Sequence, residues 1–63
     1  MKAGDLLRLR RYLVSVRRKA LLETLGETLL VLEFKRYGVL VLAGDKKRLL
    51  DGSYLREEYE VVL

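Results

Sequence analysis

Residues 28–43 constrain the fold of this chain more than any other stretch. Two apolar runs rich in Val and Leu are joined there by Lys35-Arg36-Tyr37-Gly38. Alternating apolar runs separated by a short link that contains Gly are typical of a β-hairpin. We therefore expect an antiparallel hairpin at the centre of the fold, with the rest of the chain packed against it.

The chemistry of the turn predicts a register for this hairpin. If Gly38 takes the left-handed conformation that ends a three-residue loop, Phe34 lies opposite Leu40. One face of the hairpin then carries Leu30, Leu32, Phe34, Leu40 and Leu42. The other face carries Val31, Glu33, Lys35, Val39, Val41 and Ala43.

A register that differs by one residue is the alternative, since such a shift moves every side chain to the opposite face. It places Phe34 opposite Val39 and leaves both faces almost wholly apolar. We favour the first register because it makes the hairpin amphipathic. Phe34 is then expected in the core, and Val31, Val39 and Val41 are candidates for an exposed interface.

Length and composition exclude most catalytic chemistry. The 63 residues predict a single domain, residues 1–63, with little chain left over for an enzymatic pocket. The chain has no Cys and no His, which removes thiol nucleophiles, disulfides and the commonest metal ligands. Ser53 has no base to activate it, and Glu57, Glu58 and Glu60 lack the Gly-spaced loop of a calcium site. We expect no enzyme, metal, cofactor or small-molecule substrate.

The hydropathy pattern predicts no membrane association. The longest apolar run, Val39–Ala43, has five residues, against the roughly 20 that a membrane-spanning helix needs. The first five residues, Met1-Lys2-Ala3-Gly4-Asp5, lack the apolar segment of a signal peptide. We therefore expect a cytoplasmic protein.

Charge is distributed unevenly along the chain. Residues 1–22 contain seven cations against Asp5 alone, a net charge of +6, whereas residues 23–63 carry a net charge of −2. Such asymmetry favours an anionic partner. The alternative is that the basic and acidic parts neutralise each other within the fold or within a dimer.

The first third of the chain allows more than one interpretation. Leu7 and Leu9 alternate with arginines over residues 6–10, which predicts a half-buried strand. The phase shifts after Arg11, so a bulge, two strands, or a strand followed by a loop all fit. Residues 15–25 show helical spacing, and Gly26 stands where a helix would end. We expect extended structure to about Val16, then one or two helical turns over residues 18–25.

The remaining segments are short and separated by turn residues. Gly44 and Asp45 form a tight connection to a strand over residues 47–50. A second turn at residues 51–53 precedes a single helical turn over residues 53–57 and a final strand over residues 59–63. The count is five short strands with one small helix, which predicts a mainly β, partly open barrel.

In these features the chain resembles the small SH3-like β-barrel proteins, including many short bacterial and phage-encoded ones. The resemblance rests on Gly4-Asp5-Leu6-Leu7-Arg8-Leu9, the hairpin Leu29–Leu42, and the stretch Leu49–Leu55 that precedes Tyr59-Glu60-Val61-Val62. It implies a five-stranded SH3-like barrel with a short helical turn before the last strand, in which residues 11–27 form the long first connection. It also implies an interaction module, although the fold alone does not name a partner.

Two groups of residues are candidates for binding nucleic acid. The first is an N-terminal basic cluster, in which Arg is suited to bidentate phosphate contacts and Tyr12 to base stacking. The second is the hairpin tip. The candidates are Arg8, Arg10, Arg11, Arg17, Arg18, Lys19, Arg36 and Tyr37. The alternative is that these cations are solvated or paired with carboxylates, as surface charge runs usually are.

We therefore predict a non-enzymatic protein-interaction or assembly module, with DNA or RNA binding by the N-terminal cluster as the alternative function. A homodimer at micromolar concentration is expected, because apolar residues remain that a domain of this size cannot cover. Its interface would use the exposed valines of the hairpin or the edge strand that contains Val62.

Overall fold

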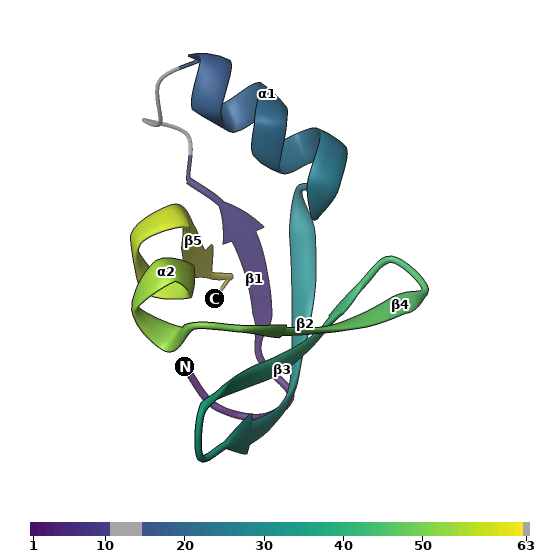
Figure 1. Cartoon of the computed structure of the whole chain (residues 1–63), viewed down its shortest axis with the longest axis vertical. Coiled ribbons are helices and arrows are strands. Elements are labelled where there is room, and N and C mark those ends of the chain that lie inside the picture. Colours follow the sequence, from purple (N-terminus) through teal and green to yellow (C-terminus); the bar gives the residue numbers. More distant parts are fainter. Residues whose placement is uncertain (11–14, 63) are drawn as a thin grey trace.

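The computed structural model describes residues 1–10 and 15–62 and shows a mainly β fold (Figure 1). The five strands are β1 (Leu6–Leu9), β2 (Thr28–Lys35), β3 (Gly38–Ala43), β4 (Lys46–Leu50) and β5 (Tyr59–Val61). The two helices are α1 (Ser15–Thr24) and α2 (Gly52–Glu58). The expectation of five short strands with a helix before the last one is confirmed.

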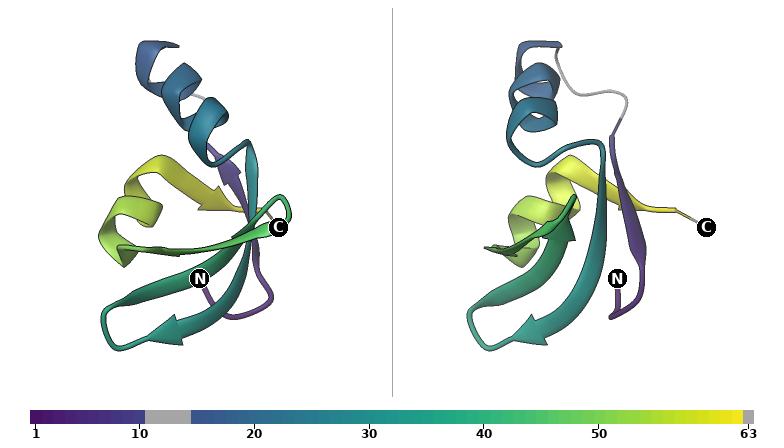
Figure 2. Two further views of the ribbon diagram at one scale, coloured as in Figure 1. Left: turned by 45° about the vertical axis from the view of Figure 1, so that its right-hand side comes forward. Right: turned by 90° about the vertical axis from the view of Figure 1, so that its right-hand side faces the viewer.

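All five strands belong to one antiparallel sheet with the order β4-β3-β2-β1-β5. The edges of this sheet are β4 and β5, and α2 connects them. Figure 2 shows that the sheet is strongly curved and that α1 lies beyond the end where β1 stops and β2 begins.

The core lies on one face of the curved sheet. Leu7 and Leu9 on β1 are fully buried, as their alternation with arginines predicted. Leu55 of α2 and Tyr59 of β5 pack into the same cluster. The buried apolar residues are Leu7, Leu9, Leu21, Leu25, Leu29, Val31, Val39, Val41, Leu55 and Tyr59.

The expected register of the β2–β3 hairpin is wrong. Lys35 pairs with Gly38 and Phe34 with Val39, so the alternative register holds at the tip. A bulge after Val31 then shifts the pairing by one further residue, and Leu30 pairs with Leu42. Gly38 does not have a positive φ. Glycine is required at position 38 for another reason, since a Cβ there would lie 2.9 Å from the carbonyl oxygen of Leu50.

This register reverses the predicted faces of the hairpin. Val31, Val39 and Val41 are at most 3% exposed and belong to the core, so they are not available as an exposed interface. Phe34 is 45% exposed instead of buried. The physical reason is that both faces of the hairpin are apolar, so amphipathicity did not discriminate between them, and the bulge allows the valines to point inward.

The connection between β1 and β2 contains the helix that the spacing of Leu21 and Leu25 predicted, and both residues are buried. The helix begins at Ser15, so the expected extended structure at residues 15–16 is wrong. Gly26 ends the helix as predicted, with φ 91° and its N–H donating to the carbonyl of Leu21 at 3.0 Å. The bulge proposed near Arg10 and Arg11 falls where the described residues stop, since β1 ends at Leu9 and residues 11–14, with the extended structure expected for them, lie outside the described ranges.

The two later turns agree with their sequence signals. Gly44 adopts φ 66° in the tight β3–β4 connection. Asp51 caps α2, because its Oδ1 accepts hydrogen bonds from the N–H groups of Ser53 and Tyr54 at 2.8 and 3.1 Å. In the part of the chain that the structure describes, neither helix has the length and apolar character needed to cross a membrane.

Candidate interaction surfaces

Arg8 of β1 and Arg10, the residue that follows this strand, face an acidic residue of the neighbouring edge strand. Arg8 and Glu60 are cross-strand partners, and their charged groups lie 3.4 Å apart. Arg10 reaches the same carboxylate at 3.8 Å and also donates two hydrogen bonds to the carbonyl of Arg56, at 2.8 and 3.1 Å. One acidic side chain near the C-terminus therefore neutralises part of the N-terminal charge.

The arginines of α1 are paired in the same way. Arg17 forms an ion pair with Glu58, which is the one buried charged side chain among the described residues. Arg18 lies 3.7 Å from Glu27 and donates a hydrogen bond to the carbonyl of Arg10 at 3.0 Å. The uneven charge distribution of the sequence is thus balanced to a large extent inside the fold.

The N-terminal basic cluster consequently offers less free charge than the sequence suggested. Four of its six cations are engaged with carboxylates. Lys19 is exposed and forms no ion pair with a described residue. Arg11 and Tyr12 lie outside the described residues. The fold therefore places most cations of the cluster next to acidic side chains, and it does not line them up as a continuous basic surface.

An apolar surface lies on the side of the sheet opposite the core, and we call it the outer face. One cross-strand row joins Leu6, Leu30 and Leu42, and the N–H of Val62 donates to the carbonyl of Leu6 at the end of this row. A second pair is formed by Leu40 and Leu49. The apolar residues of the outer face are Leu6, Leu30, Leu40, Leu42, Leu49 and Val62. Two charged residues adjoin them, since Lys47 pairs with Leu42 and Glu33 with Leu40.

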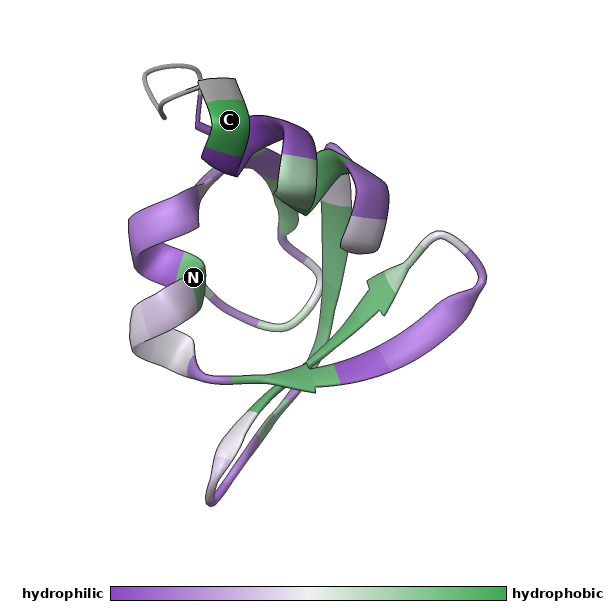
Figure 3. Cartoon of the chain, turned by 45° about the horizontal axis from the view of Figure 1, so that its top comes forward, coloured by the Kyte–Doolittle hydropathy of each residue, from purple (hydrophilic) through white to green (hydrophobic). Residues whose placement is uncertain are grey.

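The described helices do not cover the outer face. Their buried apolar residues, Leu21 of α1 and Leu55 of α2, belong to the core cluster on the other side of the sheet. Leu6, Leu49 and Val62 remain 37–45% exposed. Figure 3 shows hydrophobic colour along much of β2 and β3, where the residues of both faces are apolar. Of the four predicted interface residues, only Val62 therefore lies on an exposed surface.

The edge strand β4 is strongly basic. Lys46, Lys47 and Arg48 are exposed and form no ion pair with any residue in the described ranges. Charged side chains, Lys above all, protect an open sheet edge against pairing with other chains. We interpret these three cations as edge protection.

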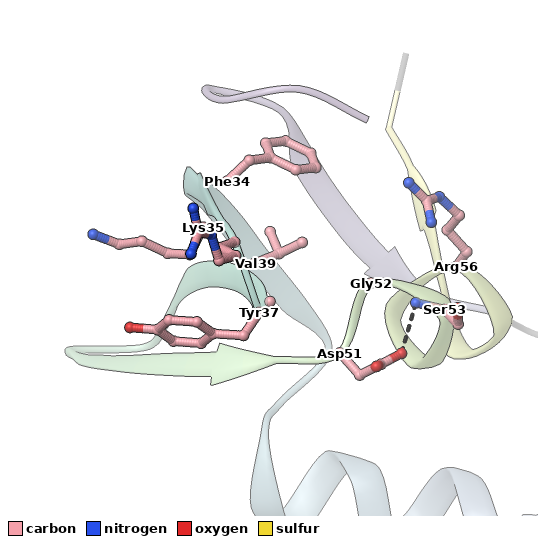
Figure 4. A pocket seen from close by; sticks show the side chains of 10 residues that line it. Phe34, Lys35, Tyr37, Val39, Asp51, Gly52, Ser53 and Arg56 are labelled. Atoms are coloured by element: carbon pink, nitrogen blue, oxygen red, sulfur yellow. Dashed lines mark hydrogen bonds between the residues drawn. The ribbon is translucent and has the colours of Figure 1, made fainter.

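A hollow opens between the tip of the β2–β3 hairpin and the start of α2, and we call it the tip hollow (Figure 4). Its volume is about 350 Å³. The residues that line it include Phe34, Arg36, Tyr37, Asp51 and Arg56. Two of the predicted site residues, Arg36 and Tyr37, thus meet Phe34 and Arg56, which sequence reasoning did not select.

The hydroxyl of Tyr59 is a buried polar group with a structural role. It donates a hydrogen bond of 2.7 Å to the carbonyl of Gly26, which ties β5 to the end of the α1 connection. Burial, with a smaller contribution from Tyr54, raises the pKa of Tyr59 to about 12. The hydroxyl therefore stays protonated and bonded over the physiological range.

The described ranges contain no group of three or more acidic side chains placed to hold a metal ion. Comparison of the chain with protein-family models, with curated proteins and with solved structures gave no match.

Proposed function

We propose that this chain is a small non-enzymatic assembly module that forms a homodimer through its outer face. The observation that carries the proposal is the cross-strand row of Leu6, Leu30 and Leu42 on a sheet surface that the described helices leave uncovered. Contiguous apolar patches of this kind usually mark interfaces. A second copy supplies a matching apolar face, since a two-fold dimer brings the same patch of both chains together.

We further assign the fold to the small SH3-like barrels. Five short antiparallel strands and a helix between the last two strands support this assignment. The connection between the first two strands is long and contains α1. An interaction module on such a scaffold needs only surface, and no catalytic group.

The alternative function, nucleic-acid binding by the N-terminal cluster, has less support. Arg8, Arg10, Arg17 and Arg18 are in ion pairs, and phosphate would have to compete with those carboxylates. Each displaced pair lowers the gain from a phosphate contact. The charge balance within the fold therefore favours assembly over phosphate binding at this cluster.

Sedimentation equilibrium of the wild type and two variants tests the proposal. Leu6→Lys places a charge in the outer face, whereas Val16→Lys makes the same kind of change at a residue of α1 that is 82% exposed. We expect the mass of two chains for the wild type and for Val16→Lys at micromolar concentration. Leu6→Lys should give the mass of one chain. A wild-type mass of one chain contradicts the proposal, and a dimer that survives Leu6→Lys contradicts the choice of surface.

A further inference from the structure

We propose that the tip hollow is a binding site for single-stranded nucleic acid, in which a base stacks on Phe34 and the adjoining phosphates contact Arg36 and Arg56. This site is separate from the outer face and does not depend on dimer formation. It also shares no residue with the N-terminal cluster.

Phe34 provides a stacking surface. Its cross-strand partner Val39 is 3% exposed, whereas the Phe34 ring is 45% exposed where the hairpin extends past the core. In Figure 4 the ring of Phe34 and the side chain of Arg56 extend toward each other from the two sides of the hollow. Tyr37, which is 77% exposed, supplies a second ring at the same tip, and Figure 4 shows this ring directed away from Phe34. Stacking on an aromatic side chain such as Phe34 tolerates any base.

Two of the three cations that line the tip hollow have no carboxylate partner among the described residues, whereas four cations of the N-terminal cluster are in ion pairs. Arg36 and Arg56 form no ion pair with any other residue of the described part of the chain. The guanidinium of Arg56 lies over Gly52, with Nη1 3.5 Å from the position that a Cβ of Gly52 would take. Both guanidinium groups are therefore open to bidentate contact with phosphate oxygens.

The acidic residue in the hollow does not offset these cations fully. Oδ1 of Asp51 accepts the two hydrogen bonds that cap α2, which commits this carboxylate to the backbone. Lys35, which also lines the hollow, lies 3.3 Å from Glu33. The free charge at the hollow is positive, and it lies beside aromatic rings.

The size and openness of the site favour a single strand over a duplex. A volume of about 350 Å³ is at the lower end of the roughly 300–1,000 Å³ typical of ligand pockets, which is enough for one nucleotide. A base can stack on Phe34 only when it is not stacked on its neighbours in the strand. The bases of a duplex are stacked on their neighbours and cannot do so. Phosphate contacts alone would not make this distinction.

Fluorescence anisotropy with a labelled oligothymidylate of about ten nucleotides tests the site, since binding domains of this size cover roughly 4–16 nucleotides. Phe34→Leu removes the ring at a half-exposed position and should weaken binding about tenfold without changing the salt dependence. Arg56→Gln should weaken binding and reduce the slope of log affinity against log salt by about 0.7, the loss of one phosphate contact on a single strand. The matched control is Lys19→Gln, which removes a cation of the N-terminal cluster that has no ion pair with a described residue, and it should change neither quantity.

Four results overturn the proposal. The first is no binding of the wild type at about 50 mM salt, where electrostatic binding is strong. The second is equal affinity of the wild type and Phe34→Leu. The third is binding of the matching duplex as tight as that of the single strand. The fourth is displacement of the oligonucleotide by thymidine monophosphate at equal nucleotide concentration, which would identify a site for free nucleotides instead of a strand.

Discussion

The guanidinium of Arg17 on α1 is paired with the carboxylate of Glu58, which is 1% exposed at the end of α2. These two residues are 41 positions apart in the sequence. Their contact ties the first helix to the second across the end of the sheet. The contact also neutralises one cation of the basic segment 1–22, because a buried carboxylate needs a partner of opposite charge.

Removal of the Arg17 charge should therefore destabilise the fold. Loss of one partner from a fully buried pair costs about 3–5 kcal/mol, and the 54% exposure of the Arg17 side chain reduces this to about 2 kcal/mol. Urea unfolding of Arg17→Gln measures the cost. Lys19→Gln is the control, with an expected change of about 0.5 kcal/mol or less. If both variants unfold at the same urea concentration as the wild type, the ion pair does not stabilise the fold.

Leu6 and Leu7 are neighbours in the chain that lie on opposite faces of the sheet. Leu7 is fully buried and Leu6 is 44% exposed. Leu7→Ala should lower the free energy of unfolding by about 2–5 kcal/mol, whereas Leu6→Ala should lower it by about 1 kcal/mol or less. Both are measured by urea unfolding at a dilution where the chain is monomeric. Similar losses for the two variants would show that the assignment of the two faces is wrong.

The raised pKa of Tyr59 predicts a loss of stability at alkaline pH. The folded state holds this proton to about pH 12, whereas the hydroxyl of the unfolded chain ionises near 10. The contribution of Tyr59 is therefore complete below pH 10 and disappears as the pH rises through 12. The expected loss is on the order of 2–3 kcal/mol at about 1.4 kcal/mol per pKa unit.

Comparison of the wild type with Tyr59→Phe isolates this contribution. Other groups also titrate above pH 9, but they do so in both proteins. The wild type should lose stability more steeply than Tyr59→Phe between pH 10 and 12, as followed by urea unfolding. Parallel losses in the two proteins would mean that the Tyr59 hydroxyl is not responsible.

The local signals in the sequence predicted the elements of the fold well. Leu7 and Leu9 alternate with arginines on β1, and Gly26 and Gly44 mark a helix end and a turn, so each of these features depends on adjacent residues alone. The hairpin register was not predictable in this way. Val31 and Leu30 are both apolar and one residue apart, and the bulge after Val31 decides which of them enters the core.

The candidate sites depended still more on the fold. Arg8 and Glu60 are 52 positions apart, so only the pairing of β1 with β5 brings the neutralising carboxylate to the basic cluster. Phe34 and Arg56 meet at the tip hollow because α2 starts beside the hairpin tip. Neither residue belongs to a motif whose spacing would have identified it.

Contacts between methyl groups of two chains would show whether the outer face is the surface through which the chain self-associates. An isotope-filtered nuclear Overhauser experiment on an equal mixture of labelled and unlabelled chains detects only contacts between different copies. We predict signals from the methyl groups of Leu6, Leu30 and Leu42, which share one row of the sheet. The absence of any signal between copies, or signals confined to residues outside the outer face such as Val16, would contradict self-association through the outer face.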